Sequence, residues 1–332
     1  EVPMKRILAW VLALASGLSA AKAKLPYTYI RVGRAADVAT SVTPGVVLMG
    51  GGTDVDAAFR WMGARSGNGD FLVIRATGTD AYNPYIQALC PASNSVATLI
   101  IPSVTAANDA RVAALIQQAE AIWIAGGDQS NYLNFWKGTA VQTALNAQIA
   151  RGVPIGGTSA GLNVLTSFIY SAQASQGATS SQALADPFNR YMTFDRDFVS
   201  LPILSGVIGD PHFETRDRMG REVAFMARVA AAGWSGAPRG IAVDEQTALL
   251  VDPASGQATV EGTGAVYFLQ APGLPETCQA RTPLTYLNLA LQRIRAGDGF
   301  DLRAWVATGG AAYTLSATAG VLTSTQAGGS LY

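Results

Sequence analysis

Short apolar runs alternate with amphipathic segments between about residues 45 and 160, and this alternation constrains the fold more than any other feature of the chain. Strands buried on both faces of a parallel sheet are nearly continuous in apolar residues, whereas helices between them carry apolar residues three and four apart. We therefore predict an α/β fold, a three-layer α/β/α sandwich with a mostly parallel sheet. The predicted strands are Val46–Met49, Phe71–Ile74, Val96–Ile101, Ile122–Ile124 and Val153–Ile155, and the predicted helices are Val55–Arg65, Arg111–Ala119 and Leu133–Ile149.

The character of the chain changes after about Leu250. Alternating segments such as Gln257–Glu261 and Ala265–Leu269, with glycines between them, predict strands, and Leu284–Ala296 is predicted as a helix. No linker is long enough to separate two domains. We expect an α/β catalytic domain over residues 24–250 and a β-rich extension over residues 251–332 that packs on the same domain.

The first residues have the pattern of a secretory signal peptide. The basic Met4-Lys5-Arg6 precedes the apolar run 7–15, and Ala21-Lys22-Ala23 offers a small-x-small cleavage site. We expect residues 1–23 to be removed, with residues 1–3 an expression remnant or the product of an upstream start. The mature protein would then be secreted or periplasmic and free of the membrane. A membrane anchor fits less well, because the apolar run is shorter than the ~20 residues that span a bilayer.

Composition narrows the classes of partner. Apolar residues make up 49% of the chain and charged residues 14%, which indicates a globular protein with a large core. The 23 basic and 23 acidic residues balance, and no run of Lys or Arg suits a series of phosphates, so nucleic acid is not expected as a partner. A homodimer remains open as an assembly state.

The chain has two cysteines and a single histidine, which limits redox and metal chemistry. Cys90 and Cys278 could form one disulfide in an oxidising compartment or remain two unpaired thiols, and their spacing does not decide between these. One histidine and two distant cysteines do not make a zinc site, so we expect no metal and no cofactor.

A serine and the single histidine are candidates for nucleophilic catalysis. Ser159 lies in Gly157-Thr158-Ser159-Ala160-Gly161, a G-x-S-x-G turn in which a strand passes into a helix and the serine projects outward. Any histidine chemistry must use His212. Serine needs such a base and a third group to orient it, and Glu245 is the favoured acid, with Asp244 as the near alternative. This order differs from that of α/β-hydrolases, whose acid lies between serine and histidine, although four acids keep that order open: Asp186, Asp195, Asp197 and Asp210.

Two backbone N–H groups could stabilise an oxyanion in this arrangement. That of Ala160 follows the nucleophile, and that of Gly127 lies in the turn Gly126-Gly127-Asp128-Gln129 after another predicted strand. The helix that begins after Ser159 would add the positive end of its dipole.

Each of these features also has a structural interpretation. The serine turn could simply join a strand to a helix, and His212 could be a buried histidine bonded to a carbonyl. Arg216, Arg218 and Arg221 do not share one helical face, so they indicate either solvated surface or a carboxylate-binding pocket. The Gly50-Gly51-Gly52-Thr53 segment lacks the last glycine of a dinucleotide motif, and we expect a tight turn in which Thr53 or Asp54 caps a helix.

Taken together, four motifs resemble those of the cyanophycinases in serine peptidase family S51, which is related to dipeptidase E. They are Gly126-Gly127-Asp128-Gln129, Gly156-Gly157-Thr158-Ser159-Ala160-Gly161, Asp210-Pro211-His212-Phe213 with the arginines that follow, and Asp244-Glu245-Gln246-Thr247-Ala248. Their order is the same, and the resemblance covers about residues 40–250. It implies a class I glutamine-amidotransferase-like, flavodoxin-like fold. It also implies a hydrolase that releases β-Asp-Arg dipeptides from cyanophycin, a poly-aspartate that carries arginine on its side-chain carboxyls.

The resemblance also implies a role for each motif residue. Ser159 would be the nucleophile, His212 the base and Glu245 the group that orients it. The residues that fall in the implied substrate pocket are Gln129, Asp210, Arg216, Arg218 and Arg221. Pro211 and Leu162 depart from the family pattern, and Leu162 could reshape the pocket beside the nucleophile. A dipeptidase E-like exopeptidase for aspartyl or isoaspartyl peptides, and a catalytically silent binding protein, are the alternative functions.

Overall fold

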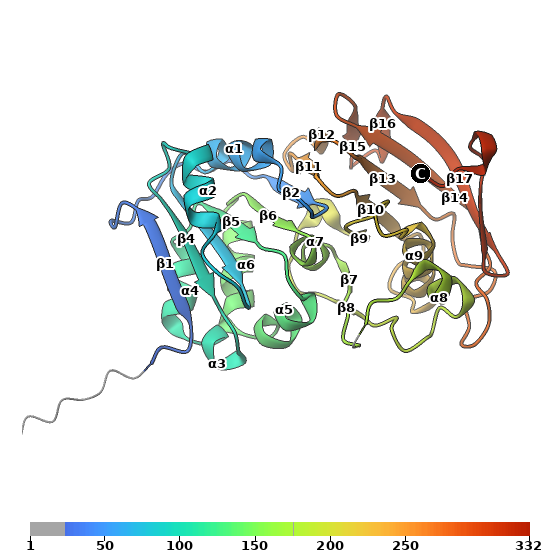
Figure 1. Ribbon diagram of the computed structural model, residues 1–332, viewed down its shortest axis with the longest axis horizontal. Helices are drawn as coiled ribbons and strands as arrows, with labels where there is room; N and C mark the ends of the chain where they lie inside the picture. The colour runs from blue at the N-terminus through green and yellow to red at the C-terminus, as the bar shows by residue number, and fades with distance from the viewer. Residues whose placement is uncertain (1–23, 175) are drawn as a thin grey trace, which may run out of the picture.

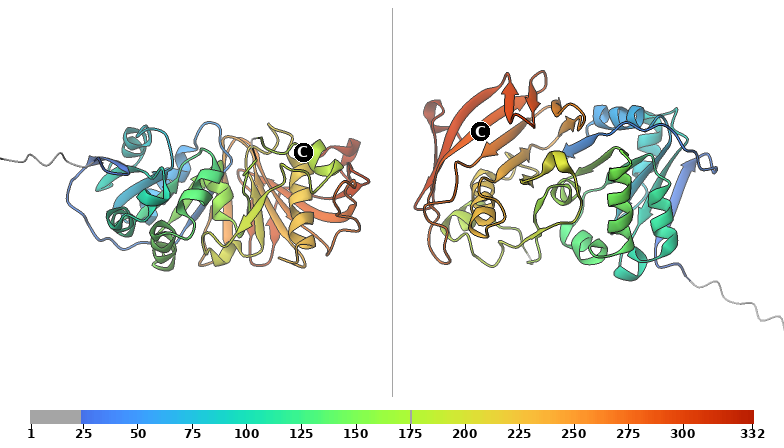
Figure 2. Two further views of the ribbon diagram at one scale, coloured as in Figure 1. Left: turned by 90° about the horizontal axis from the view of Figure 1, so that it is seen from below. Right: turned by 180° about the vertical axis from the view of Figure 1, so that it is seen from behind.

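The computed structural model describes residues 24–174 and 176–332, so the predicted signal peptide over residues 1–23 lies outside the described residues. Two sheets lie side by side along the long axis of the molecule (Figures 1 and 2), one of ten strands and one of eight. Blue-to-green segments form most of the first sheet, and orange-to-red segments most of the second. The α/β class is confirmed, but both sheets are mixed, whereas we predicted one mostly parallel sheet.

The first sheet has a parallel centre and antiparallel flanks. Its order is β1-β4-β3-β5-β6-β2-β11-β12-β15-β16, and the strands from β4 to β2 are parallel to one another. The parallel strands are β2 (Val46–Met49), β3 (Asp70–Arg75), β4 (Ser95–Ile100), β5 (Ala121–Ile124) and β6 (Ile155–Thr158). The flanking strands are β1 (Thr28–Gly33), β11 (Thr247–Val251), β12 (Gln257–Gly262), β15 (Gly299–Asp301) and β16 (Val306–Thr308).

Helices cover both faces of this parallel centre because its strands are apolar on both sides. Val47, Val73 and Trp123 face the layer of α1 (Asp56–Arg65) and α2 (Tyr82–Leu89), while Leu48 and Ile122 face the opposite layer. That second layer contains α3 (Val104–Ala107), α4 (Ala110–Gln117), α5 (Gln129–Trp136), α6 (Ala140–Ala150) and α7 (Ala160–Leu165). Because these strands are parallel, their carboxyl ends meet along one edge of the sheet, where ligands of such sheets usually bind.

The second sheet has the order β18-β17-β14-β13-β10-β9-β7-β8 and supplies the other part of the site. Two helices cover one face, and the stacked rings of Phe268 and Phe300 join the other face to the first sheet. The elements are β7 (Phe168–Tyr170), α8 (Ser180–Ala185), β8 (Phe194–Arg196), β9 (Val207–Asp210), α9 (Met219–Ala231), β10 (Arg239–Val243), β13 (Ala265–Gln270), β14 (Tyr286–Arg295), β17 (Ala311–Thr318) and β18 (Val321–Ser324). The extension after residue 250 contributes strands to both sheets.

Three predictions about local structure are wrong. The predicted helix Leu284–Ala296 is strand β14, and the predicted helix Leu133–Ile149 is divided into α5 and α6 at Gly138, whose φ is 73°. Neither Thr53 nor Asp54 caps the helix after the glycine turn, because the N-cap position of α1 is Val55, which makes no side-chain cap bond.

The two cysteines do not form the disulfide that the sequence left open. Both are free, with Cys90 buried at the end of α2 and Cys278 half-buried before β14. Among residues 24–174 and 176–332, no helix combines the length and the apolarity that a membrane crossing requires.

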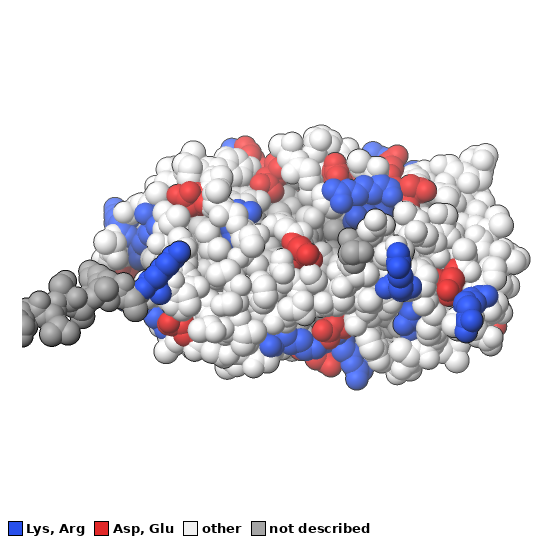
Figure 3. All heavy atoms as spheres, turned by 60° about the horizontal axis from the view of Figure 1, so that its bottom comes forward, with Lys and Arg blue, Asp and Glu red and all other residues white. Residues whose placement is uncertain are grey.

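Charges on the face of the molecule in Figure 3 are scattered. Blue and red groups lie intermixed, with wide uncharged areas between them, so this face offers no extended surface of one sign. Such a surface is what binding to a polyanion requires.

Candidate active site

Ser159 lies at a strained turn between β6 and α7. Its φ of 54° and ψ of −113° are unusual for a residue with a side chain and thrust Oγ away from the sheet. The backbone N–H of Ser159 donates to the carbonyl of Met49, 3.0 Å away. A Cβ on Gly157 would lie 2.6 Å from the carbonyl carbon of Gly161. The glycines of the motif are therefore needed so that strand and helix can meet this closely.

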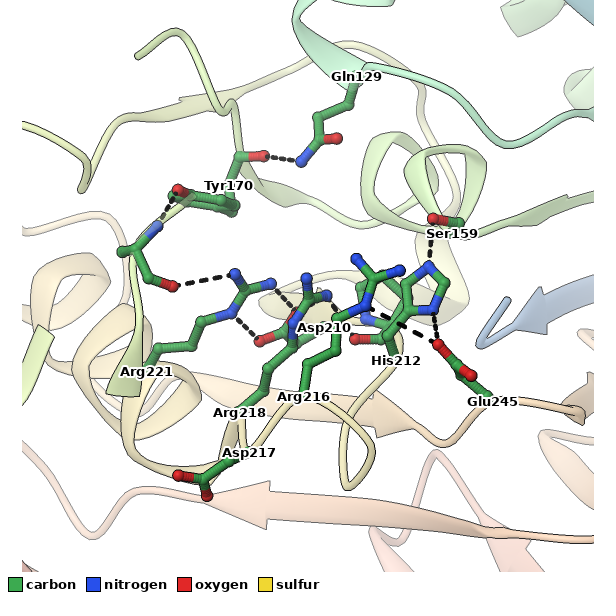
Figure 4. Close-up of polar contacts among 12 residues, drawn as sticks. Gln129, Ser159, Tyr170, Asp210, His212, Arg216, Asp217, Arg218, Arg221 and Glu245 are labelled. Atoms are coloured by element: carbon green, nitrogen blue, oxygen red, sulfur yellow. Dashed lines mark hydrogen bonds and ion pairs between the residues drawn. The ribbon is translucent and has the colours of Figure 1, made fainter. Parts of the chain in front are cut away.

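His212 contacts Ser159 from the second sheet. It follows β9 with a φ of 50°, and its backbone N–H donates to the carbonyl of Gly50 at 2.8 Å. Its Nε2 is 2.7 Å from the Oγ of Ser159, and its Nδ1 is 2.6 Å from Oε1 of Glu245 (Figure 4). A carboxylate only accepts, so Nδ1 carries the proton and Nε2 accepts from the serine hydroxyl. These three side chains have the geometry of a nucleophile, a base and an orienting acid.

The structure distinguishes Glu245 from Asp244. Both follow β10, which is the parallel neighbour of β9, so the ends of these strands bring the acids close to the histidine. Asp244 is turned away and buried, where its carboxylate accepts from the backbone N–H groups of Glu214 and Ala265, each at 2.9 Å. Glu245 alone of the two reaches His212.

Burial sets the protonation state of the histidine. Desolvation lowers the pKa of His212, and this effect outweighs the hydrogen bond to Glu245, which raises it; the positive charges of Arg216 and Arg218 lower it further. The imidazole is therefore neutral at pH 7, as a general base must be.

The glycine turn after β2 supports the histidine, a role that sequence reasoning missed. Gly51 has a φ of 98°, and a Cβ at this position would lie 2.2 Å from Cε1 of the His212 ring. Its carbonyl accepts from the N–H of Gln246, directly after Glu245, at 2.8 Å. The sequence signal was present as three consecutive glycines at the carboxyl end of a buried strand.

A pocket of about 190 Å³ opens beside Ser159 and His212. Gln129 lies across it, and its Nε2 donates to the carbonyl of Tyr170 at 3.2 Å. Asn163, one turn after the serine in α7, also lines the pocket and was not predicted. Leu162, which could have reshaped the pocket, is fully buried in the core against Gly209 and does not line it.

Asp210 is enclosed by the protein and does not line the pocket. Its side chain is completely buried, Nε of Arg221 donates to its Oδ2 at 2.7 Å, and Nη2 of Arg221 donates to its Oδ1. Nη1 of Arg218 also donates to Oδ1, at 3.3 Å. The carboxylate thus binds two guanidinium groups, and both belong to the protein.

The three arginines differ in exposure. Arg221 is almost wholly buried, lies over the ring of Tyr170, and donates to the carbonyl of Ala178. Arg218 retains 13% side-chain exposure, donates to the carbonyl of Pro211 at 2.7 Å, and has its pKa lowered to about 10 by burial. Arg216 is about half exposed, with Nε 3.8 Å from Oε1 of Glu245. Arg216 and Arg218 therefore present positive charge to the pocket. Asp210, which is paired with Arg221, binds Arg218 from the buried side.

The predicted oxyanion donors lie beside the nucleophile. Gly127 lines the pocket with Ser159, and a Cβ on the preceding Gly126 would lie 3.6 Å from that of the serine. Ala160 is the first residue of α7. Their roles as donors stay predictions.

The described residues contain no group of three or more His, Cys, Asp and Glu side chains that could hold a metal ion. What they do contain is a serine with a neutral base, an acid that orients the base, and three arginine side chains that line a small pocket. This arrangement suits acyl transfer from a substrate that carries a carboxylate.

Comparisons with known proteins agree with this chemistry. The profile of peptidase family S51 matches residues 75–258. Cyanophycinase from Trichormus variabilis is 28% identical over 197 residues, which cover 58% of this chain and 60% of that protein. Cyanophycinase from Geminocystis herdmanii is 28% identical over 193 residues, or 56% and 64% of the two chains. The crystal structure of a peptidase from an acI-B1 Actinobacterium shares the fold, with a TM-score of 0.52 at 15% identity over 79% of this chain and 98% of that one.

Proposed function

This chain belongs to peptidase family S51, and we propose that it is a serine peptidase in which Ser159 attacks the carbonyl carbon of an aspartyl peptide bond. The observation that carries the proposal is the continuous relay from Ser159 Oγ through the ring of His212 to Glu245, with contacts of 2.7 and 2.6 Å. A silent binding protein on the same fold would have no need to keep this geometry.

In the first half of the reaction, His212 Nε2 takes the hydroxyl proton as Ser159 Oγ bonds to the carbonyl carbon. The carbonyl oxygen becomes an oxyanion that faces the N–H groups of Gly127 and Ala160. Glu245 stabilises the imidazolium that forms. His212 then gives its proton to the amine nitrogen, the C–N bond breaks, and an acyl-enzyme remains on Ser159.

In the second half, water takes the place of the amine. His212 accepts a proton from the water as its oxygen attacks the acyl carbon, and a second tetrahedral intermediate forms in the same oxyanion site. When this intermediate collapses, the proton returns to Ser159 Oγ and the carboxylic acid product leaves. The enzyme regains its starting state with no cofactor in the cycle.

Arg216 and Arg218 favour substrates with a free carboxylate close to the scissile bond, because a guanidinium binds a carboxylate through charge and paired N–H donors. In cyanophycin, each arginine is joined through its α-amine and keeps a free α-carboxylate. We propose that this carboxylate binds to the two arginines, and that the product is the β-Asp-Arg dipeptide. The matching cyanophycinases support this choice of polymer.

Short aspartyl or isoaspartyl peptides are the second candidate substrates, and the size of the pocket favours them. A volume of about 190 Å³ is below the ~300–1,000 Å³ of pockets for drug-sized ligands, so one residue fills it and the rest of a polymer must lie outside. A dipeptide leaves one further residue outside the pocket, whereas a polymer leaves a long chain there.

The test is to incubate residues 24–332 with purified cyanophycin and, separately, with a panel of α- and β-aspartyl dipeptides, and to identify products by mass. Ser159→Ala is assayed in parallel. Release of β-Asp-Arg by the wild type alone supports the polymer substrate, and cleavage of dipeptides alone supports the second candidate. If folded wild-type protein cleaves neither and Ser159 does not react with a fluorophosphonate, the peptidase proposal is wrong.

A further inference from the structure

Helix α9 begins without a cap of its own. Its N-cap residue is Arg218, whose side chain makes no cap hydrogen bond. The first N–H groups of a helix have no partner within the helix, and Ser, Thr, Asp or Asn usually provides one from the N-cap position. The start of α9 therefore needs partners from elsewhere in the chain, at the point that carries Arg218 and Arg221.

Two side chains distant in sequence supply these partners. The hydroxyl of Tyr332 accepts from the N–H of Met219 at 3.0 Å and donates to Oδ1 of Asp217 at 2.9 Å. The hydroxyl of Ser180 accepts from the N–H of Arg221 at 3.2 Å and donates to the carbonyl of Asp217.

Arg218 lies between the two groups that Tyr332 binds. Asp217 precedes it with a strained φ of 46°, and Met219 follows it. One hydroxyl thus binds the backbone N–H on one side of the arginine that faces the pocket and the side-chain carboxylate on the other. Burial raises the pKa of this hydroxyl, so it stays protonated and continues to donate to Asp217.

The ring of Tyr332 also packs under the loop that carries the base. It meets Phe213, the residue after His212, edge to face at a centroid distance of 5.8 Å, and Tyr267 at 6.0 Å. The residue before it is held separately, because the hydroxyl of Tyr313 donates to the carbonyl of Leu331 at 2.9 Å.

We propose that Tyr332 is a positioning residue of the carboxylate pocket, which caps α9 from outside and thereby fixes the backbone of Arg218. The β-rich extension would then contribute to substrate binding without contacting the substrate. The kinetic part of this inference rests on the proposed function, whereas its structural part can be measured without any turnover.

The structural part is tested in Tyr332→Phe, which keeps the ring and removes the hydroxyl. Tyr313→Phe, on β17, is the matched control, because it removes a hydroxyl that binds the residue before Tyr332 but keeps the hydroxyl that caps α9. Loss of one cap contact should speed amide hydrogen exchange at Met219 about fivefold. We expect this in Tyr332→Phe and not in Tyr313→Phe. Equal exchange in the two variants would overturn the proposal, whatever the enzyme cleaves.

The kinetic part is measured with cyanophycin, or with β-Asp-Leu if the enzyme cleaves dipeptides only. Tyr332→Phe should raise KM about three- to tenfold with kcat within twofold, and inactivation by phenylmethylsulfonyl fluoride should keep its wild-type rate. In an Arg218→Ala background the same change should leave KM unaltered, because the effect acts through that arginine. A fall in kcat alone, or the same rise in KM without Arg218, would refute the positioning role.

Discussion

The catalytic relay and the arginine cluster lie side by side, but they are built in different ways. The arginine cluster consists of the three arginines that line the pocket and the carboxylate that two of them bind: Arg216, Arg218, Arg221 and Asp210. The relay stands on backbone geometry: Ser159, His212 and Gln246 all have positive φ, and N–H groups bonded to Met49, Gly50 and Gly51 fix them. The cluster depends on buried charges, because the carboxylate of Asp210 accepts hydrogen bonds from two guanidinium groups. Distortion of the relay should therefore reduce kcat, whereas disruption of the cluster should reduce stability and substrate affinity.

The largest effect is expected from His212→Ala. The chain has no second histidine to replace the base, so kcat should fall by about 10⁴-fold or more with the fold retained. Product release over time and a circular dichroism spectrum measure the two properties. Retention of a tenth of wild-type kcat would exclude His212 as the base.

Glu245→Gln should lower kcat by about 10³-fold, because an amide does not stabilise the imidazolium or fix its tautomer as a carboxylate does. Asp244→Asn is the control, since Asp244 binds the N–H groups of Glu214 and Ala265 and the hydroxyl of Tyr267 but does not contact His212. It should destabilise the fold and keep kcat within about tenfold. The reverse result would assign the orienting role to Asp244.

Asp210→Asn tests whether the buried carboxylate stabilises the arginine cluster. Removal of one partner of a buried ion pair leaves the other charge uncompensated, so unfolding should become easier by about 3–5 kcal/mol in urea titrations. Asp252→Asn breaks a partly exposed pair with Arg65 and should cost less than about 1 kcal/mol. Similar losses in both variants would argue against the structural role of Asp210.

Gly51→Ala separates backbone strain from contact with the histidine. The new methyl group would push on the His212 ring, so kcat should fall about 10- to 100-fold. Gly138→Ala also places alanine at positive φ, but nothing lies within 4 Å of the new Cβ, so kcat should stay the same despite some loss of stability. If the two variants lose kcat equally, strain alone explains the effect.

The smallest effect concerns pH. The pKa of His212 is lowered chiefly by burial, and catalysis needs the neutral ring, so kcat/KM should fall below pH 6.5 with a midpoint under the usual value for histidine. Arg216→Ala removes one positive charge that disfavours the imidazolium, so the midpoint should move to higher pH by a few tenths of a unit. Arg111→Ala, on α4, should leave it unchanged. An unmoved midpoint in Arg216→Ala would mean that solvent screens this charge.

The wrong predictions have identifiable physical causes. In β14, Tyr286, Leu289, Leu291 and Ile294 are buried, and a register shift near Asn288, whose φ is 59°, breaks the two-residue alternation. The resulting spacing of three, two and three residues imitates a helix. The interruption between α5 and α6 depended on one glycine at positive φ, and an amphipathic pattern does not show such a break.

The residues alone were enough to identify the parallel centre of the first sheet, the serine turn and the single histidine. These follow from residue type and local spacing, because apolar runs must be buried and glycines permit the close turn. The tertiary structure alone decided that Glu245 rather than Asp244 reaches the base, that Asp210 binds the protein's own arginines, and that Tyr332 caps α9. Those outcomes depend on which strand ends and loops meet in space. The neighbours of a polar side chain in the fold, and not its position in the chain, decide whether it is buried and what it pairs with.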